Sequence, residues 1–442
     1  MSTASSIAPA KKSYFMPLLI IGALFFSFGF LTWVNGTLIP YLKIACELKS
    51  DTLSFLVATA FFIAYVVMAI PSSYVLKFTG YKKGMSLGLL IMACGTLTFI
   101  PAAESRNFSL FLTGLFVIGT GLALLQTASN PYMSVIGPIE SAGARISIMG
   151  ICNKTAGILA SLIFGYIALN DADGITERLK TMSDAQRVET LNELAGRVVQ
   201  PYIIITIALV VLAVAVYFSS LPDMQEQTEV PSKPGVKEKT SIFQYPHLWL
   251  GVLAMFLYVG VEVLAGDTVI SYGKSIGIPL SEAKFFTTGT LLCMLVGYIV
   301  GIVAIPKYLS QQNAVRACSI LGVIFSTFAV VTTGYTSVIF IILLGLANSL
   351  MWPSIFPLAI DGLNKFTKIG SALLIMGIGG GAVLPLVYGS MVDHHAHKLV
   401  AEGVSQLTAK ATSARNAYWI MIPCFMYLFY YSTRGYKAGR NL

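Results

Sequence analysis

The feature that most constrains this chain is a series of twelve apolar stretches, separated by short polar segments, that runs almost from end to end. Each stretch is long enough to cross a bilayer as a helix, which takes about 20 largely apolar residues. The sequence therefore predicts an all-α membrane protein with twelve transmembrane helices. We expect these helices at 16–42, 52–76, 84–103, 108–136, 142–169, 198–221, 247–272, 283–305, 313–333, 335–360, 369–392 and 416–434.

The composition excludes a soluble globular protein. Apolar residues make up 56% of the chain and charged residues 11%, whereas soluble domains carry about 25% charged residues. The six cysteines are scattered singly, without the spacing of a disulfide framework or a zinc site. The polar segment 1–12 leads into an apolar stretch that has no small-residue cleavage site after it. We therefore expect 16–42 to be a retained helix and not a signal peptide.

The distribution of charge predicts the orientation and the domain organisation. Lys and Arg are more frequent in the loops on the side of both termini, which places the N- and C-termini in the cytoplasm. The inner segment 222–245 is rich in Pro, Lys, Glu and Ser and is typical of a flexible linker. It divides the chain into two six-helix halves, 1–221 and 246–442. The net charge of +9 follows from this topology and indicates no nucleic-acid partner.

The two predicted halves show a weak internal similarity. GLALLQTASNPYM (121–133) in the first half aligns with GLANSLMWPSIFP (345–357) in the second, so that Gln126 falls opposite Asn348. Two parallel repeats around a central site are typical of a transporter whose halves rock. A chance match between two apolar, glycine-containing helices is the alternative.

Polar residues inside the apolar stretches are the candidate site, because polarity at membrane depth is costly and usually functional. A lone amide can instead bond a neighbouring helix, a contact worth about 0.6 kcal/mol. The set as a whole favours a sugar cavity, since amides pair with vicinal hydroxyls and an aromatic face can stack on a pyranose ring. The candidate substrate-binding residues are Asn35, Gln126, Asn130, Asn153, Asn348 and Trp352.

Three ionisable residues also lie inside predicted helices. Lys154 is roughly 18 Å from the inner end of its helix, too deep for its ammonium to reach the membrane surface. It either pairs with Glu262 across the two halves, or bonds helix carbonyls or is neutral. Asp267 lies about 140° around the helix from Glu262, so the two carboxylates cannot both face a central cavity squarely. We expect one to be a site or ion-coupling residue and the other to be structural.

Other chemistry is not indicated. The run from Asp393 to His397 contains three histidines, but it lies at an outer helix end, where we expect a solvated loop and no metal site. The sequence has no phosphate-binding loop, nucleotide fingerprint, zinc-protease motif or nucleophile elbow. We therefore predict no enzyme activity, no metal and no cofactor.

Several strings resemble the fucose/glucose/galactose permease family of the major facilitator superfamily. They are LLQTASNPYMSVIGP (124–138), GFLTWVNGTLIPYLK (29–43), WPSIFPLAI (352–360) and GIGGGAVLPLVYG (377–389). The resemblance implies a bacterial inner-membrane sugar transporter of the major facilitator fold. It also implies that the family's helix-1 Asn-Asp pair meets Asn35-Gly36 here, and that its helix-4 glutamate meets Gln126. The sugar-contacting asparagine and the helix-10 aromatic of the family meet Asn153 and Trp352.

These departures bear on coupling, because the family's two proton-carrying carboxylates are both missing and a glutamine cannot titrate. We expect a monomeric carrier of a monosaccharide such as glucose, mannose or galactose that works by alternating access. The missing acids favour a facilitator. H⁺- or Na⁺-coupled symport through Asp267 and Glu262 is the alternative. The rival functions are a drug or amino-sugar permease, a membrane enzyme and a membrane sugar sensor that does not transport.

Overall fold

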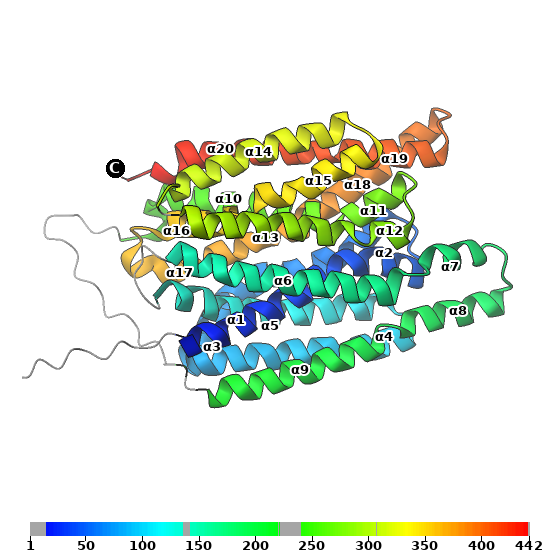
Figure 1. Cartoon of the computed structure of the whole chain (residues 1–442). Coiled ribbons are helices and arrows are strands. Elements are labelled where there is room, and N and C mark those ends of the chain that lie inside the picture. The colour runs from blue at the N-terminus through cyan, green and yellow to red at the C-terminus, as the bar shows by residue number, and fades with distance from the viewer. Residues whose placement is uncertain (1–14, 136–141, 220, 222–239, 306, 441–442) are drawn as a thin grey trace, which may run out of the picture.

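The structure is a computed structural model that describes residues 15–135, 142–219, 221, 240–305 and 307–440. These residues form a bundle of helices that run between two ends of the molecule, and none of them lies in a strand (Figure 1). We call the end where the first helix begins and the last one finishes the terminal end. The opposite end, which carries the two short helices α7 and α8, is the loop end. Most of the predicted linker, 222–239, lies outside the described residues.

Figure 1 shows the N-terminal helices, α1–α9, packed together as one group beside the C-terminal helices, α10–α20. The N-terminal helices are α1 (Phe15–Trp33), α2 (Asn35–Ala45), α3 (Asp51–Leu97), α4 (Phe99–Glu104), α5 (Phe108–Val135), α6 (Ala142–Leu169), α7 (Ala172–Arg178), α8 (Asp184–Gly196) and α9 (Val199–Phe218).

The C-terminal helices are α10 (Pro246–Asp267), α11 (Val269–Ser275), α12 (Leu280–Ala283), α13 (Phe286–Ala304), α14 (Gln311–Val331), α15 (Gly334–Asn348), α16 (Met351–Ile360), α17 (Thr367–Met376), α18 (Gly380–Ala401), α19 (Gln406–Ala417) and α20 (Met421–Thr433). Short 3₁₀ turns join several of them: η2 (Ile242–Gln244), η3 (Asn364–Phe366), η4 (Gly377–Gly379), η5 (Tyr418–Ile420) and η6 (Gly435–Lys437).

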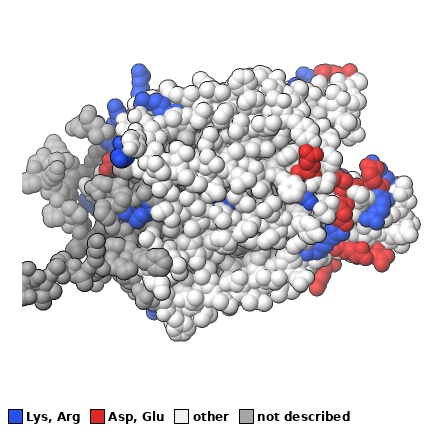
Figure 2. Space-filling model, viewed as in Figure 1, with Lys and Arg blue, Asp and Glu red and all other residues white. Residues whose placement is uncertain are grey.

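The described helices fit a membrane protein. Ten of them, or runs of them, are long and apolar enough to cross a bilayer. Figure 2 shows the charged side chains gathered at the two ends, with a wide band between them that is nearly free of charge on this face. The longest candidate span, Asp51–Glu104, has 54 residues and is interrupted at Gly80, where φ is 73°. The expected helices 52–76 and 84–103 lie on either side of that glycine. Twelve crossings and the orientation stay predictions.

The structure breaks several of the expected helices into shorter ones. The stretch 16–42 is interrupted between α1 and α2, 84–103 between α3 and α4, and 335–360 between α15 and α16. The last of these breaks, at Ser349 and Leu350, lies three to four residues before Pro353, and a proline has no N–H for the carbonyl four residues earlier. The break at Val34 lies six residues before Pro40. The stretch 369–392 breaks at the glycines of η4, and 247–272 breaks at Thr268, where no proline is present.

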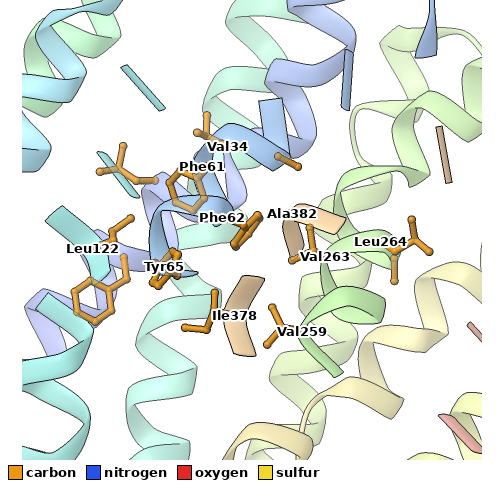
Figure 3. Packing of buried hydrophobic residues seen from close by; sticks show 14 of the residues in the cluster. Val34, Phe61, Phe62, Tyr65, Leu122, Val259, Val263, Leu264, Ile378 and Ala382 are labelled. Carbon is orange, nitrogen blue, oxygen red and sulfur yellow. The ribbon is translucent and has the colours of Figure 1, made fainter. Parts of the chain in front are cut away.

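Glycines let the two groups of helices approach closely. A Cβ atom on Gly150 of α6 would lie 2.6 Å from the ring of Tyr298 on α13. One on Gly389 of α18 would lie 3.1 Å from the Cα atom of Thr52 on α3. Figure 3 shows Phe62 of α3 packed beside residues of α10 and α18 in the buried core. Close contact at these points places the cavity described below between the two groups.

Candidate functional site

A cavity lies between the N-terminal and the C-terminal helices. It contains about 710 Å³ of empty space, part of it open to solvent. Its walls come from α1, α3, α5, α6, α10, α13, α16 and η4. The predicted site residues that line it are Gln126, Asn130, Asn153, Lys154, Glu262 and Trp352.

The polar and aromatic groups on the cavity wall are held in place by neighbouring side chains. Gln126 Nε2 donates a hydrogen bond to the hydroxyl of Tyr65 at 3.0 Å. Asn130 lies one helical turn further along α5 and also lines the cavity. The ring of Trp352 stacks on that of Phe356, with the ring centres 5.9 Å apart. The cavity therefore presents amides from one group of helices and an indole from the other.

Lys154 and Glu262 form an ion pair across the two groups of helices. Lys154 Nζ on α6 lies 2.9 Å from Glu262 Oε1 on α10. Both residues are less than 9% exposed, so neither charge is well screened by water. Lys154 Nζ also lies 4.2 Å from the centre of the Trp33 ring, where the face of an indole attracts a cation. Of the two arrangements that the sequence left open for Lys154, the structure shows the pair with Glu262.

Trp33 is a cavity residue that the sequence analysis missed. Its indole N–H donates to Asn153 Oδ1 at 3.1 Å, which fixes the orientation of that amide. Its ring fits against glycines on two helices: a Cβ atom on Gly157 or on Gly266 would lie 2.5 Å from it. The only sequence signal was the presence of glycines in the facing helices. Tyr65, Tyr258 and Tyr298 also line the cavity without having been predicted.

Two predicted sugar-binding residues do not line the cavity. Asn35, at the start of α2, and Asn348, at the end of α15, are at most 1% exposed. Within the described part of the chain, neither side-chain amide has a hydrogen-bond partner. Each lies at a break between two helices, where a sequence-based estimate of the direction of the side chain fails.

Asp267 lies outside the cavity, whereas Glu262 lines it. Asp267 is 1% exposed, and among the described residues neither of its carboxylate oxygens has a hydrogen-bond partner. A Cβ atom on Gly36 of α2 would lie 3.3 Å from Asp267 Oδ1. Gly36 is the position that the resemblance aligns with the family's helix-1 acid. Here a carboxylate reaches the same place from α10.

Charged contacts join the two groups at the loop end. Asp393 of α18 accepts hydrogen bonds from the backbone N–H groups of Asp51 and Thr52 at the start of α3, at 3.1 and 2.8 Å. Asp51 also pairs with Lys43 of α2 and, at 2.9 Å, with Lys410 of α19. We call these five residues the loop-end latch.

The same region corrects a prediction. Residues 393–397 were expected in a solvated loop, but they lie inside α18, which continues to Ala401. His395 Nδ1 is 3.0 Å from the hydroxyl of Ser413. No group of three or more His, Cys, Asp or Glu side chains in the described ranges is placed to hold a metal ion.

Comparison with known proteins agrees with this architecture. Residues 21–385 match the Major Facilitator Superfamily. A glucose/galactose transporter of Brucella abortus is 32% identical over 436 residues, which covers 97% of this chain and 96% of that protein. The L-fucose-proton symporter of Escherichia coli is 29% identical and covers 90% of this chain and 92% of its own length.

A solved structure gives the same result in three dimensions. The crystal structure of the E. coli fucose:proton symporter in the outward conformation superposes with a TM-score of 0.72 at 28% identity. The match covers 95% of this chain and 99% of the symporter. With ten candidate spans, a cavity between two groups of helices, and matches over nearly its whole length, this chain is a multi-pass membrane protein that belongs to the major facilitator superfamily.

Proposed function

We propose that this protein transports a monosaccharide, a hexose such as glucose, mannose or galactose, across the bacterial inner membrane by alternating access. The observation that carries the proposal is the cavity between the two groups of helices, with its oriented amides, two indoles and buried ion pair. The relatives, a glucose/galactose transporter and a fucose-proton symporter, support a sugar as the substrate. They are transporters and not enzymes.

The chemistry of the wall fits a hexose. Gln126 and Asn153 offer amide donors and acceptors to vicinal hydroxyls, while Trp352 offers an aromatic face to the apolar side of the ring. Lys154 and Glu262 add charge-assisted donors and acceptors, which bind hydroxyls more strongly than neutral groups do. Asn35 and Asn348 are left out of the proposed contacts because they do not line the cavity.

Polar contacts between the two groups of helices close the loop end. The loop-end latch and the hydrogen bond from Lys284 Nζ to Asn170 Oδ1 (2.7 Å) join the groups at the loop end. With both termini in the cytoplasm, as we propose from the excess of Lys and Arg in the terminal-side loops, these contacts close the outer side. Rocking of the groups would break them and expose the cavity to the outside.

Two modes of transport are compatible with this cavity. The absence of acids at Gly36 and Gln126 supports a facilitator. The buried, unpartnered carboxylate of Asp267 is the specific observation that supports the second candidate, cation-coupled symport.

The first test is equilibrium binding of labelled glucose, mannose and galactose to the purified protein, with Gln126→Ala and the exposed control Gln406→Ala. We expect saturable binding of at least one hexose that Gln126→Ala weakens by about 1–3 kcal/mol, because the cavity loses a hydrogen-bonding group. Gln406→Ala should bind as the unchanged protein does. Absence of saturable hexose binding, or full affinity in Gln126→Ala, would contradict the proposed site.

Counterflow of labelled hexose into proteoliposomes separates the rival functions. Exchange of internal for external sugar requires that the cavity open to both sides, so a transporter shows it without any ion gradient. Saturable binding without counterflow would instead indicate a membrane sugar sensor. Transport of hydrophobic cations in place of hexoses would indicate a drug permease.

A further inference from the structure

Asp267 lies in a small polar region between the two groups of helices, separate from the sugar cavity. It ends α10, and it faces the first turn of α2 and the first turn of α13. The side chain is 1% exposed, and none of the described residues hydrogen-bonds to its carboxylate. A charged group buried without a partner is strongly destabilising. Something that the protein binds must therefore supply the missing positive charge.

Two further oxygen atoms lie close to this carboxylate around Gly36. A Cβ atom on Gly36 would lie 3.1 Å from Thr287 Oγ1, 3.2 Å from the backbone oxygen of Gly266 and 3.3 Å from Asp267 Oδ1. The three oxygens therefore cluster against the backbone of Gly36, where a side chain would be in close contact with all of them. Thr287 donates its hydroxyl proton to the Gly266 carbonyl at 2.6 Å. The lone pairs of its oxygen therefore remain available to a ligand.

Further unpartnered polar groups lie next to these residues in the chain. The side-chain amide of Asn35 and the hydroxyls of Thr37 and Thr288 are buried and lack hydrogen-bond partners within the described ranges. Buried polar groups are nearly always hydrogen-bonded in folded proteins. Asn35 and Thr37 flank Gly36 in the chain, and Thr288 follows Thr287, so these groups belong to the same turns as the proposed site.

We propose that Asp267, Thr287 and the backbone carbonyl of Gly266, facing Gly36, form a binding site for a monovalent cation. That the bound cation drives uptake rests on the proposed hexose transport. Carboxylate, hydroxyl and carbonyl oxygens are the ligands of hard cations. One carboxylate balances one positive charge, whereas divalent sites usually combine several carboxylates. Na⁺ and the proton are the two cations of this class that the test below distinguishes.

Among the described residues, no cationic side chain pairs with Asp267. On α2, α6, α10, α11 and α13 the other charged groups are Lys43, Arg145, Lys154, Glu262 and Lys274. Lys154 is paired with Glu262, Lys43 is paired with a carboxylate of the loop-end latch, Lys274 is exposed, and Arg145 lies in the first turn of α6 at the terminal end. The remaining titratable groups on these elements, which are ordinarily neutral at pH 7, are Tyr41, Cys152, Tyr166, His247, Tyr258, Tyr272, Cys293 and Tyr298.

Trp33 connects this site to the sugar cavity. One edge of its ring packs against Gly266, and its N–H holds Asn153 on the cavity wall. The proposed ligands come from α10 and α13, whereas Gly36, which supplies no ligand, comes from α2 in the other group of helices. Gly36 covers the ligands only while the two groups are together at this level. Opening of the loop end would therefore expose a bound cation to water and allow it to leave.

The test is thermal unfolding of the purified protein in detergent, without sugar, in NaCl or in choline chloride of equal ionic strength. A ligand that binds only the folded state raises the unfolding temperature. We expect a saturable rise with Na⁺ in the unchanged protein and in the exposed control Glu189→Gln. In Asp267→Asn, the half-saturating Na⁺ concentration should increase by more than about tenfold.

Two further measurements keep the test decisive if Asp267→Asn folds poorly. Gly36→Ala fills the space beside the carboxylate, and Thr287→Val removes an oxygen at constant volume. Both should abolish the effect of Na⁺, whereas Thr287→Ser should keep it. If Na⁺ has no effect, the dependence of stability on pH is measured. A stability that falls as pH rises in the unchanged protein, and does not fall in Asp267→Asn, would show that the site binds a proton. The proposal is overturned if the stability of the unchanged protein responds to neither Na⁺ nor pH. It is also overturned if the response is the same in Asp267→Asn, Gly36→Ala and Thr287→Val as in the unchanged protein.

Transport distinguishes this inference from the proposed function. In proteoliposomes, a gradient of the cation identified above should drive hexose accumulation in the unchanged protein and in Glu189→Gln, and not in Asp267→Asn. Cation-dependent stability that requires Asp267, in a protein that binds no hexose, would leave the cation site standing while the hexose function fails.

Discussion

At the scale of single residues, the Lys154–Glu262 pair is the strongest electrostatic feature of the cavity. Two opposite charges that are both nearly buried stabilise one another, but much of that attraction only offsets the loss of hydration. The pair is therefore better explained by what it does in the cavity than by stability. It holds a donor and an acceptor at fixed positions between the two groups of helices, beside the ring of Trp33.

This view makes a prediction about stability. Lys154→Met leaves the Glu262 carboxylate buried alone and should lower the free energy of unfolding by about 3–5 kcal/mol. The double variant Lys154→Met/Glu262→Met should recover most of that loss, since it replaces both charges by apolar groups. Thermal unfolding in detergent measures both effects. Lys180→Met, which breaks an exposed pair with Glu177, is the control and should unfold as the unchanged protein does.

A double variant that is as unstable as Lys154→Met would show that the loss comes from packing and not from an unpaired charge. The recovered double variant should still fail to bind hexose if the pair contacts the sugar as proposed.

At the scale of elements, the interrupted helices and the glycines determine where the site lies. The breaks after α1 and α10 bring Gly36 and Asp267 together, and transporters commonly build their sites at such discontinuities. Glycines then bring neighbouring helices into backbone contact. On α18, a Cβ atom at Gly380 would lie 1.8 Å from the backbone oxygen of Phe256 on α10. That contact leaves no room for any side chain.

Gly380→Ala should therefore be destabilising, by about 1–3 kcal/mol or more, because α18 must move away from α10. The matched control is Gly174→Ala on α7, where an added Cβ atom would meet nothing within 4 Å. The control should be neutral or slightly stabilising, since alanine favours a helix over glycine. Unfolding temperatures measured side by side decide the point. Equal effects of the two substitutions would argue against this close contact of α10 and α18.

The sequence predicted the helices well where hydropathy alone decides their ends, and less well where geometry does. The expected helices 108–136 and 142–169 correspond closely to α5 and α6. Gln126 and Asn130 line the cavity, as their spacing on one helix face predicted. Asn35 and Asn348 lie beside breaks, where the helical phase changes and the predicted direction of a side chain no longer holds. Trp33 was missed because its role depends on glycines in two distant helices.

At the scale of the whole molecule, the loop-end latch holds the two groups together. Asp393 caps the start of α3 from the other group, and Asp51 gathers two lysines, one from each group. Such contacts must break whenever the cavity opens toward the loop end. They therefore stabilise the conformation that is closed at the loop end relative to the one that is open there.

Asp393→Ala should shift that balance toward the state that is open at the loop end. The measurement is the distance between probes on Ser105→Cys and Leu407→Cys, in a Cys94→Ser background. The labelled sites are exposed near the loop end, one in each group. We expect longer distances in Asp393→Ala and unchanged distances in the control Glu402→Gln. An unchanged distribution in Asp393→Ala would show that the latch does not limit opening.

The contact between Gly36 and Asp267 has a consequence for how such proteins diverge. A carboxylate on residue 36 would enter the space that Asp267 Oδ1 already borders, and two acids so close cannot both ionise. An acid can therefore pass from α2 to α10 during evolution only through an ancestor with neither acid, or with two acids that share a proton. Homologous sequences with an acid at both positions should therefore be much rarer than those with one acid. The numbers of homologous sequences with no acid, one acid or two acids at these positions would show through which intermediate the acid moved.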